Sequence, residues 1–225
     1  MVEAAVLNVF ADSEGDHGNP VGVVIDDGRR LGSAERLKIA QTLGFSESVF
    51  VNSLETMSIS IFNPQQEIGF SGHAAIGAAW YIQHSLGRPV SQLAGLDGTI
   101  RAWSEDDLGW VESELRSTPP WCVERVSSVE TIDALSGPQS PVQDHTLLWA
   151  WIDEPAGQIR GRTFASAWGI VEDEANGSGC MRLASTLGRR IEVRHGIGSV
   201  VYARPERPGY TAAGGRVAIK ETREI

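Results

Sequence analysis

Short runs of apolar and β-branched residues recur along this chain, and most are bounded by Gly, Pro, Asn or Asp. Runs of this kind, about four to eight residues long, predict β-strands. We expect strands over residues 5–10, 21–25, 48–51, 57–62, 146–152, 191–193, 199–202 and 216–220, and a further strand ending at Thr163-Phe164. Because few helices accompany these strands, the predicted fold class is α+β.

Helical spacing of apolar residues appears in three places. Residues 33–43 are predicted to form a helix with Ser33 as its N-cap and Gly44 as its C-cap. Residues 72–84 are apolar nearly all round, which predicts a buried helix. Residues 179–187 are predicted to form a third, shorter helix.

A Pro-rich segment over residues 113–141 marks a boundary between two halves. We expect an N-terminal lobe over 1–115 and a C-terminal lobe over 116–225, with a last strand that either stays in the second lobe or returns to the first. Each half contains a strand, an acidic connection and a helix that opens at glycine, Gly72 in one and Gly177 in the other. This degenerate repeat suggests an internal duplication.

The net negative charge of the chain disfavours two classes of binding partner. Of 225 residues, 29 are acidic and 19 are basic, which gives a net charge of −10. An acidic chain repels phosphate backbones and anionic lipid surfaces, so we expect neither nucleic acid nor membrane as a partner. No apolar run reaches the roughly 18 residues of a membrane span. The N-terminus lacks the basic start of a signal peptide. We therefore expect a cytoplasmic protein.

The two helix openings at Gly72 and Gly177-Ser178 are candidate anion sites. A helix N-terminus offers unpaired N–H groups and a partial positive charge, and small residues let an anion approach the backbone. The alternative is that each glycine only permits a tight turn from strand to helix. The five histidines and two cysteines show no metal-ligand spacing, so we expect no metal.

Two residues of the first half are candidates for moving a proton. Glu47 has aromatic and apolar neighbours; on a core-facing side of a strand it would be a buried carboxylate with a raised pKa, and otherwise a solvated residue at the rim. His73 stands at the opening of the buried helix. A neutral imidazole there could donate a hydrogen bond or relay a proton, or it could simply cap or pack.

The second half offers weaker candidates. Asp173 precedes the second glycine turn and is either an acid/base group or a solvated acid. Cys180 lies in a first helical turn, which could lower its pKa, although a buried and inert cysteine is the alternative.

Four stretches together resemble the PhzF-like family of phenazine biosynthesis, within the diaminopimelate-epimerase-like fold. They are residues 9–24, residues 40–50, residues 62–74 and residues 169–178. The resemblance implies two pseudo-symmetric lobes, each a bent mixed sheet around a central helix, with the second lobe shorter here than in most members. It also implies a cofactor-free isomerase. By motif position, Glu47 would remove and return a proton, His73 and Asp173 would assist, and Asn19, Gly72, Gly177 and Ser178 would bind substrate.

Three functions follow as hypotheses. The first is an isomerase that shifts a proton on a small carboxylate-bearing substrate through Glu47. The second is an epimerase or racemase that uses Glu47 with Asp173 or Cys180. The third is a non-catalytic ligand-binding protein, because a shortened second lobe could leave the substrate wall incomplete.

Tryptophans gather around the boundary and in the second half, at positions 103, 110, 121, 149 and 151. Trp149 and Trp151 have the same strand parity and so point to one face. Because a monomer rarely leaves so much aromatic surface uncovered, we expect a homodimer. The alternative is that the tryptophans fill an intramolecular core.

Overall fold

The computed structural model describes residues 1–87, 89–137, 145–166 and 170–225. Pro138, Pro141 and Gly169, which entered the sequence interpretation, lie outside the described residues. The chain divides into two compact units. The first comprises Met1–Val9, Asn19–Val111 and Arg216–Ile225, and the second comprises Phe10–Gly18 and Glu112–Gly215. The segment 10–18 therefore belongs with the second unit, and residues 216–225 belong with the first.

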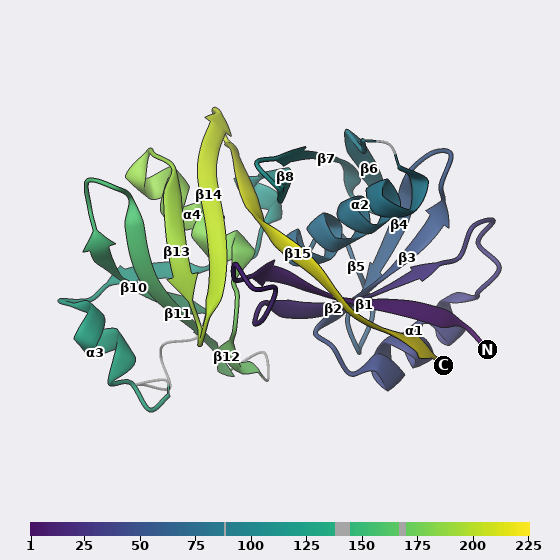
Figure 1. The fold of residues 1–225 in the computed structure, drawn as a ribbon, viewed down its shortest axis with the longest axis horizontal. Helices are drawn as coiled ribbons and strands as arrows, with labels where there is room; N and C mark the ends of the chain where they lie inside the picture. Colours follow the sequence, from purple (N-terminus) through teal and green to yellow (C-terminus); the bar gives the residue numbers. More distant parts are fainter. Residues whose placement is uncertain (88, 138–144, 167–169) are drawn as a thin grey trace. The chain divides into compact units, whose positions relative to one another are not determined.

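Most of the first unit is a mixed sheet with two helices (Figure 1). Its elements in chain order are β1 (Glu3–Ala11), β2 (Asn19–Ile25), α1 (Ser33–Leu43), β3 (Glu47–Ser53), β4 (Ser58–Phe62), β5 (Glu67–Ile68), α2 (Gly72–Leu86), β6 (Gln92–Gly95), β7 (Gly98–Glu105) and β8 (Leu108–Glu114). Strand β1 lies antiparallel to β2. Val2 and Ile225 exchange both backbone hydrogen bonds at 2.9 Å, so residues 216–225 close this unit.

The second unit is likewise a mixed sheet with helices. A short 3₁₀ turn (Leu115–Ser117) leads into it. Its elements are β9 (Cys122–Arg125), α3 (Val129–Asp133), β10 (Thr146–Asp153), β11 (Gln158–Ala165), β12 (Ile170–Asp173), α4 (Gly177–Leu187), β13 (Ile191–His195), β14 (Ser199–Arg207) and the start of β15 (Tyr210–Glu224), which passes into the first unit at Arg216. Helix α4 packs mainly against β14, and α3 packs against β10 and β11.

The two units repeat one series of strand pairings. In the first, β2 is parallel to β3, β3 antiparallel to β4, β4 antiparallel to β5 and parallel to β6, and β6 antiparallel to β7. In the second, β9, β10, β11, β12, β13 and β14 pair in the same order and with the same senses. Every pairing in this series has a counterpart, so the expected shortening of the second half removes none of the repeated strands.

The two faces of β3 are covered by different helices. Ala4, Val24, Phe50 and Phe62 form a buried cluster with three apolar residues of α1, namely Ile39, Ala40 and Leu43. A Cβ on Gly77 of α2 would instead meet Val21, Val9 and Leu7. Because Val21 lies opposite Glu47 in the parallel pair, the odd-numbered positions of β3 face α2.

Helix α1 also carries a buried ion pair. The Arg36 guanidinium contacts the Asp26 carboxylate, and these side chains are 2% and 3% exposed. Arg36 donates a second hydrogen bond to Asn52 Oδ1 at 2.7 Å, and Asp26 accepts from the backbone N–H groups of Arg30 and Leu31. The network joins the end of β2, α1 and β3 in the interior of the first unit.

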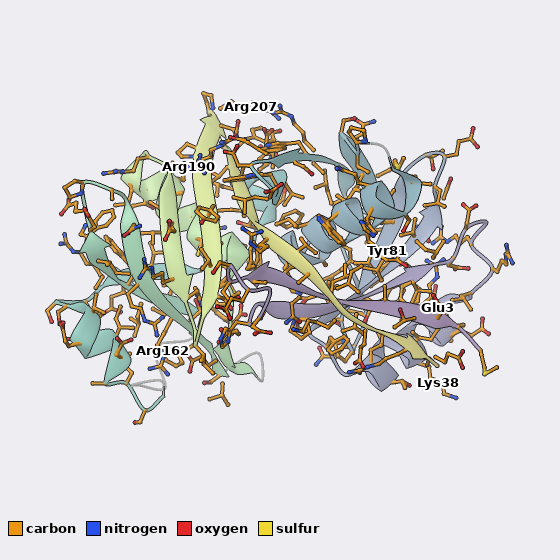
Figure 2. All side chains as sticks on the ribbon, in the orientation of Figure 1. Glu3, Lys38, Tyr81, Arg162, Arg190 and Arg207 are labelled. Atoms are coloured by element: carbon orange, nitrogen blue, oxygen red, sulfur yellow. The ribbon has the colours of Figure 1, made fainter. Side chains whose placement is uncertain are left out.

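In the second unit, Arg162 ties β11 to its neighbours (Figure 2). Its guanidinium donates two hydrogen bonds of 2.7 Å to the Glu172 carboxylate of β12. It also donates to the carbonyl of Ile132 in α3 and to that of Leu135 just beyond it. Arg162 therefore holds α3 on one face of β11.

The helices begin slightly differently from the prediction. Gly32, not Ser33, is the N-cap of α1, because the Glu35 carboxylate accepts a hydrogen bond of 2.8 Å from the Gly32 N–H. Gly44 ends this helix in the left-handed conformation, as predicted. Helix α4 begins at Gly177 rather than Gly179, because Asn176 caps it. Within the described ranges, no helix is long and apolar enough to cross a membrane.

The tryptophans that motivated the homodimer are covered to a large extent within one chain. Trp110 and Trp149 are buried, and Trp103, Trp121 and Trp151 are half-buried. Trp149 and Trp151 meet edge to face with ring centroids 5.3 Å apart. Their packing accounts for part of the aromatic surface, and the homodimer stays a prediction for sedimentation analysis.

Candidate active site

Glu47 and His73 meet in the first unit. Glu47 is the first residue of β3 and lies on the face that α2 covers. His73 is the second residue of α2. Its Nε2 lies 3.1 Å from Glu47 Oε2, with the two side chains 9% and 19% exposed. Strand parity and the helix start thus bring together two residues that are 26 positions apart in the chain.

The pKa of Glu47 is lowered from its ordinary value. Burial alone would raise the pKa of this carboxyl, but the charge of His73 and hydrogen bonds from His73 and Ser46 outweigh that effect. The expectation of a raised pKa for a buried Glu47 is therefore wrong. At neutral pH the group is a carboxylate, which is the form that accepts a proton.

The imidazole of His73 is held at both nitrogens. Its Nδ1 lies 3.3 Å from the hydroxyl of Ser71, the N-cap residue of α2, and its Nε2 faces Glu47. Because a carboxylate can only accept, Nε2 carries the proton that points toward Glu47. His73 can therefore donate to Glu47, which stabilises the carboxylate form.

The two glycines that open helices differ in what surrounds them. A Cβ at Gly72 would meet nothing within 4 Å, so packing does not require glycine there. A Cβ at Gly177 would lie 2.8 Å from the ring of Phe10. Neither glycine has a positive φ. The absence of a side chain therefore serves packing at Gly177, whereas at Gly72 it leaves open space beside the helix end.

Alanine substitutions separate these two roles. Gly72→Ala is expected to leave the free energy of unfolding unchanged or slightly raised, because alanine favours a helix and meets no neighbour, while the affinity for a carboxylate ligand falls. Gly177→Ala is expected to lower the free energy of unfolding by about 1–3 kcal/mol, because the Phe10 ring must shift. Urea unfolding and ligand titration of both variants test this. Equal losses of stability would contradict the assignment.

Asn19 begins β2 on the face that α2 covers. It is buried and lies two positions before Val21, the residue opposite Glu47. Of the predicted site residues, Glu47, His73, Gly72 and Asn19 thus belong to the first unit.

The remaining predicted residues belong to the second unit. Asp173 ends β12, and its Oδ1 accepts a hydrogen bond of 3.1 Å from the Ala175 N–H. Gly177 and Ser178 form the first turn of α4. The Asn176 side chain caps this turn, because its Oδ1 accepts from the Gly179 N–H at 2.8 Å. The indole of Trp121 donates to Ser178 Oγ at 2.8 Å.

Cys180 is buried, as the inert alternative requires. Burial raises the pKa of its thiol far above the ordinary value, and the charge of Asp173 raises it further. A lowered pKa for Cys180 is therefore excluded, since desolvation outweighs the helix N-terminus. A thiol that keeps its proton is not suited to abstract one.

His195 of β13 lies close to the start of α4. Its Nδ1 donates to the Glu174 carbonyl at 2.8 Å, and its Nε2 lies 2.9 Å from Thr163 Oγ1. Burial lowers the pKa of His195, although the charges of Asp173 and Glu174 and the carbonyl of Glu174 oppose this and Arg160 adds to it. The imidazole is therefore neutral at physiological pH.

The lowered pKa of His195 predicts a pH dependence of stability. Above about pH 6.5 neither the folded nor the unfolded state protonates this residue. Below that pH the unfolded state binds a proton that the folded state does not, so the free energy of unfolding falls down to the folded-state pKa. Urea unfolding between pH 7.5 and 5.5 should show a steeper decline in the wild type than in His195→Gln. Parallel declines would contradict the assignment.

A family profile described as phenazine biosynthesis-like protein matches residues 7–136 of this chain. This match covers more than half of the sequence. The chain belongs to the phenazine biosynthesis-like family.

One relative and two solved structures are similar to this chain over most of its length. The trans-2,3-dihydro-3-hydroxyanthranilate isomerase of Pseudomonas aeruginosa is 29% identical, over 91% of this chain and 90% of that protein. A phenazine biosynthesis PhzC/PhzF protein from Clostridium difficile has the same fold, with a TM-score of 0.80, 16% identity, and coverage of 100% of this chain and 99% of that one. A hydroxyproline epimerase from Agrobacterium vitis has a TM-score of 0.60 and 13% identity, and the match covers 99% of this chain and 91% of that one. The protein is an enzyme of the isomerase class.

Several polar residues around the first turn of α4 were not singled out from the sequence. Thr163, Asn176 and Trp121 bond to one another or to Ser178 in the second unit, and His195 joins them. Asn176 could have been found as a helix N-cap ahead of glycine. For His195 no local pattern exists, because its partner Thr163 is 32 positions away.

Proposed function

We propose that this member of the phenazine biosynthesis-like family is a cofactor-independent isomerase that shifts a proton on a small carboxylate-bearing substrate. Glu47 takes the proton from one carbon and returns it to another. The observation that carries the proposal is the ion pair of Glu47 and His73 at the opening of α2. The pair keeps Glu47 ionised, which is the form that can take a proton from carbon.

The substrate carboxylate would bind at helix openings. The first N–H groups of α2 and of α4 have no acceptor within their own helices. At Gly72 the space beside the helix end is open. His73 and Asp173 would assist proton transfer, and Asn19, Gly72, Gly177 and Ser178 would hold the substrate.

The relative from Pseudomonas aeruginosa supplies the first substrate to test. Its name specifies trans-2,3-dihydro-3-hydroxyanthranilate, which carries a carboxylate and ring C–H bonds. The protein is incubated with this compound in D2O, and the product is analysed by NMR. The expected result is a shifted double bond with deuterium at the carbon that receives the proton.

Other outcomes separate the rival functions. If that compound does not react, small carboxylates such as proline and hydroxyproline follow under the same conditions. Exchange with inversion at a single carbon, without a moved double bond, would indicate an epimerase. Such a reaction needs a second acid/base group. Asp173 is the candidate for that role, whereas Cys180 is buried and keeps its proton. Calorimetric binding without any exchange would indicate a ligand-binding protein and overturn the proposal.

A further inference from the structure

A continuous chain of hydrogen bonds runs through the second unit beneath the first turn of α4. It links Trp121 Nε1 to Ser178 Oγ (2.8 Å), Ser178 Oγ to Asn176 Oδ1 (3.2 Å), Asn176 Nδ2 to Thr163 Oγ1 (3.4 Å), Thr163 Oγ1 to His195 Nε2 (2.9 Å), and His195 Nδ1 to the Glu174 carbonyl (2.8 Å). Thr163, Asn176 and His195 are buried.

The groups at the two ends of this hydrogen-bond series determine which partner donates and which accepts in each bond. The indole N–H of Trp121 can only donate, so the Ser178 hydroxyl gives its own proton to Asn176 Oδ1. The Gly179 N–H also requires the oxygen of Asn176, which leaves the amide nitrogen facing Thr163. At the other end, a carbonyl can only accept, so His195 carries its proton on Nδ1.

At Nε2, His195 therefore accepts a hydrogen bond rather than donating one. With Nδ1 protonated and Nε2 bare, the imidazole accepts from the Thr163 hydroxyl. The Thr163 oxygen can then accept from the Asn176 amide. If Nε2 carried the proton instead, it would donate to the Thr163 oxygen. The Thr163 hydroxyl would then have no acceptor at His195 for its own proton. The groups that face His195 electrostatically are Asp173, Glu174 and Arg160.

We propose that His195 is a positioning residue for the α4 part of the site. Through Thr163 it holds the Asn176 amide in one orientation. In this orientation Asn176 Oδ1 accepts hydrogen bonds from the Gly179 N–H and from the Ser178 hydroxyl. The Ser178 hydroxyl is committed to Asn176, so in the proposed function the first-turn amides of Gly177 and Ser178, and not this hydroxyl, would bind the substrate carboxylate. This role in substrate binding rests on the proposed function, but the orientation of the cap does not.

Two pairs of matched variants test the proposal. In His195→Gln the side-chain amide lies near the original Nε2 and can accept from Thr163, whereas in His195→Asn it lies near Nδ1 and can bond only to Glu174. Thr163→Ser keeps the hydroxyl, and Thr163→Val removes it with little change of shape. Hydrogen exchange of the Gly179 amide is measured by NMR without substrate, and kcat and KM are measured with the substrate of the isomerase assay.

The two variants of each pair are expected to differ in Gly179 amide exchange and in KM. His195→Asn and Thr163→Val should exchange the Gly179 amide about tenfold faster, which corresponds to the loss of one hydrogen bond, and should raise KM by a similar factor. Their kcat should change less, because Glu47 is untouched. His195→Gln and Thr163→Ser should stay within about twofold of the wild type. Equal effects of all four variants would indicate a general structural role and overturn the proposal.

A measurement on the wild type alone completes the test. The ¹⁵N shifts of the His195 ring report which nitrogen is protonated, and we expect Nδ1. Protonation at Nε2 would overturn the proposal even if every variant were poorly folded. If the exchange and tautomer results hold but no substrate turns over, the proposed function fails and the positioning of the cap stands.

Discussion

Glu47→Gln is expected to abolish the exchange of a substrate C–H proton with solvent deuterium. Glutamine has the same shape and can still accept from His73 Nε2, but it cannot take a proton from carbon. General base catalysis contributes about 10²- to 10⁴-fold, so the rate should fall by at least the lower figure. Fold and ligand affinity should be retained, because the side chain still fills the same space.

The control for this experiment is Glu55→Gln, which removes a carboxylate from an exposed turn of the same unit. Its exchange rate should match that of the wild type. The rate of the wild type should persist to acid pH, because the lowered pKa of Glu47 keeps its basic form present below the ordinary range. Exchange that survives in Glu47→Gln would remove Glu47 from the mechanism.

Arg36→Met should cause one of the largest losses of stability in the molecule. The substitution leaves the Asp26 carboxylate buried and without its cationic partner, and Asn52 loses a hydrogen bond. Breaking a buried ion pair from one side costs about 3–5 kcal/mol in the free energy of unfolding. Urea unfolding at neutral pH measures this loss.

Lys38→Met is the matched control, because it removes a cation from an exposed position of the same helix. Its effect should stay within about 0.5 kcal/mol. In an Asp26→Asn and Arg36→Met double variant the buried charge is gone, so the loss should be smaller than for Arg36→Met alone. A double variant as unstable as the sum of the two single variants would show that the pair is not coupled.

Local pattern was sufficient to predict the elements with strong periodicity. The apolar segment 72–84 became the buried helix α2, and the runs at 21–25 and 48–51 became the parallel neighbours β2 and β3. Strands β5, β6, β7, β8, β9 and β12 and helix α3 were not predicted from the sequence. In β7 four of the eight residues are exposed or half-buried polar or charged side chains, so its apolar signal is weak.

The candidate site likewise has features that could be predicted from the sequence and features that could not. Glu47 and His73 could be singled out from the sequence, and the family resemblance implied their roles. Their separation and the sign of the Glu47 pKa shift depend on tertiary packing, since the burial of Glu47 and the approach of His73 act in opposite directions. The order of the hydrogen bonds from Trp121 to His195 depends on contacts between residues up to 57 positions apart, which no local pattern encodes.

The discontinuity of both units has a consequence for synthesis on the ribosome. Residues 216–225 pair with the start of the first unit, and the whole stretch Glu112–Gly215 is translated before them. The first unit therefore stays incomplete while the second is made, with β1 paired to β2 on one edge and unpaired on the edge that later meets residues 216–225. Closing a loop of this length costs entropy and slows folding. During that interval the growing chain exposes an apolar strand edge, which is the kind of surface that chaperones shield.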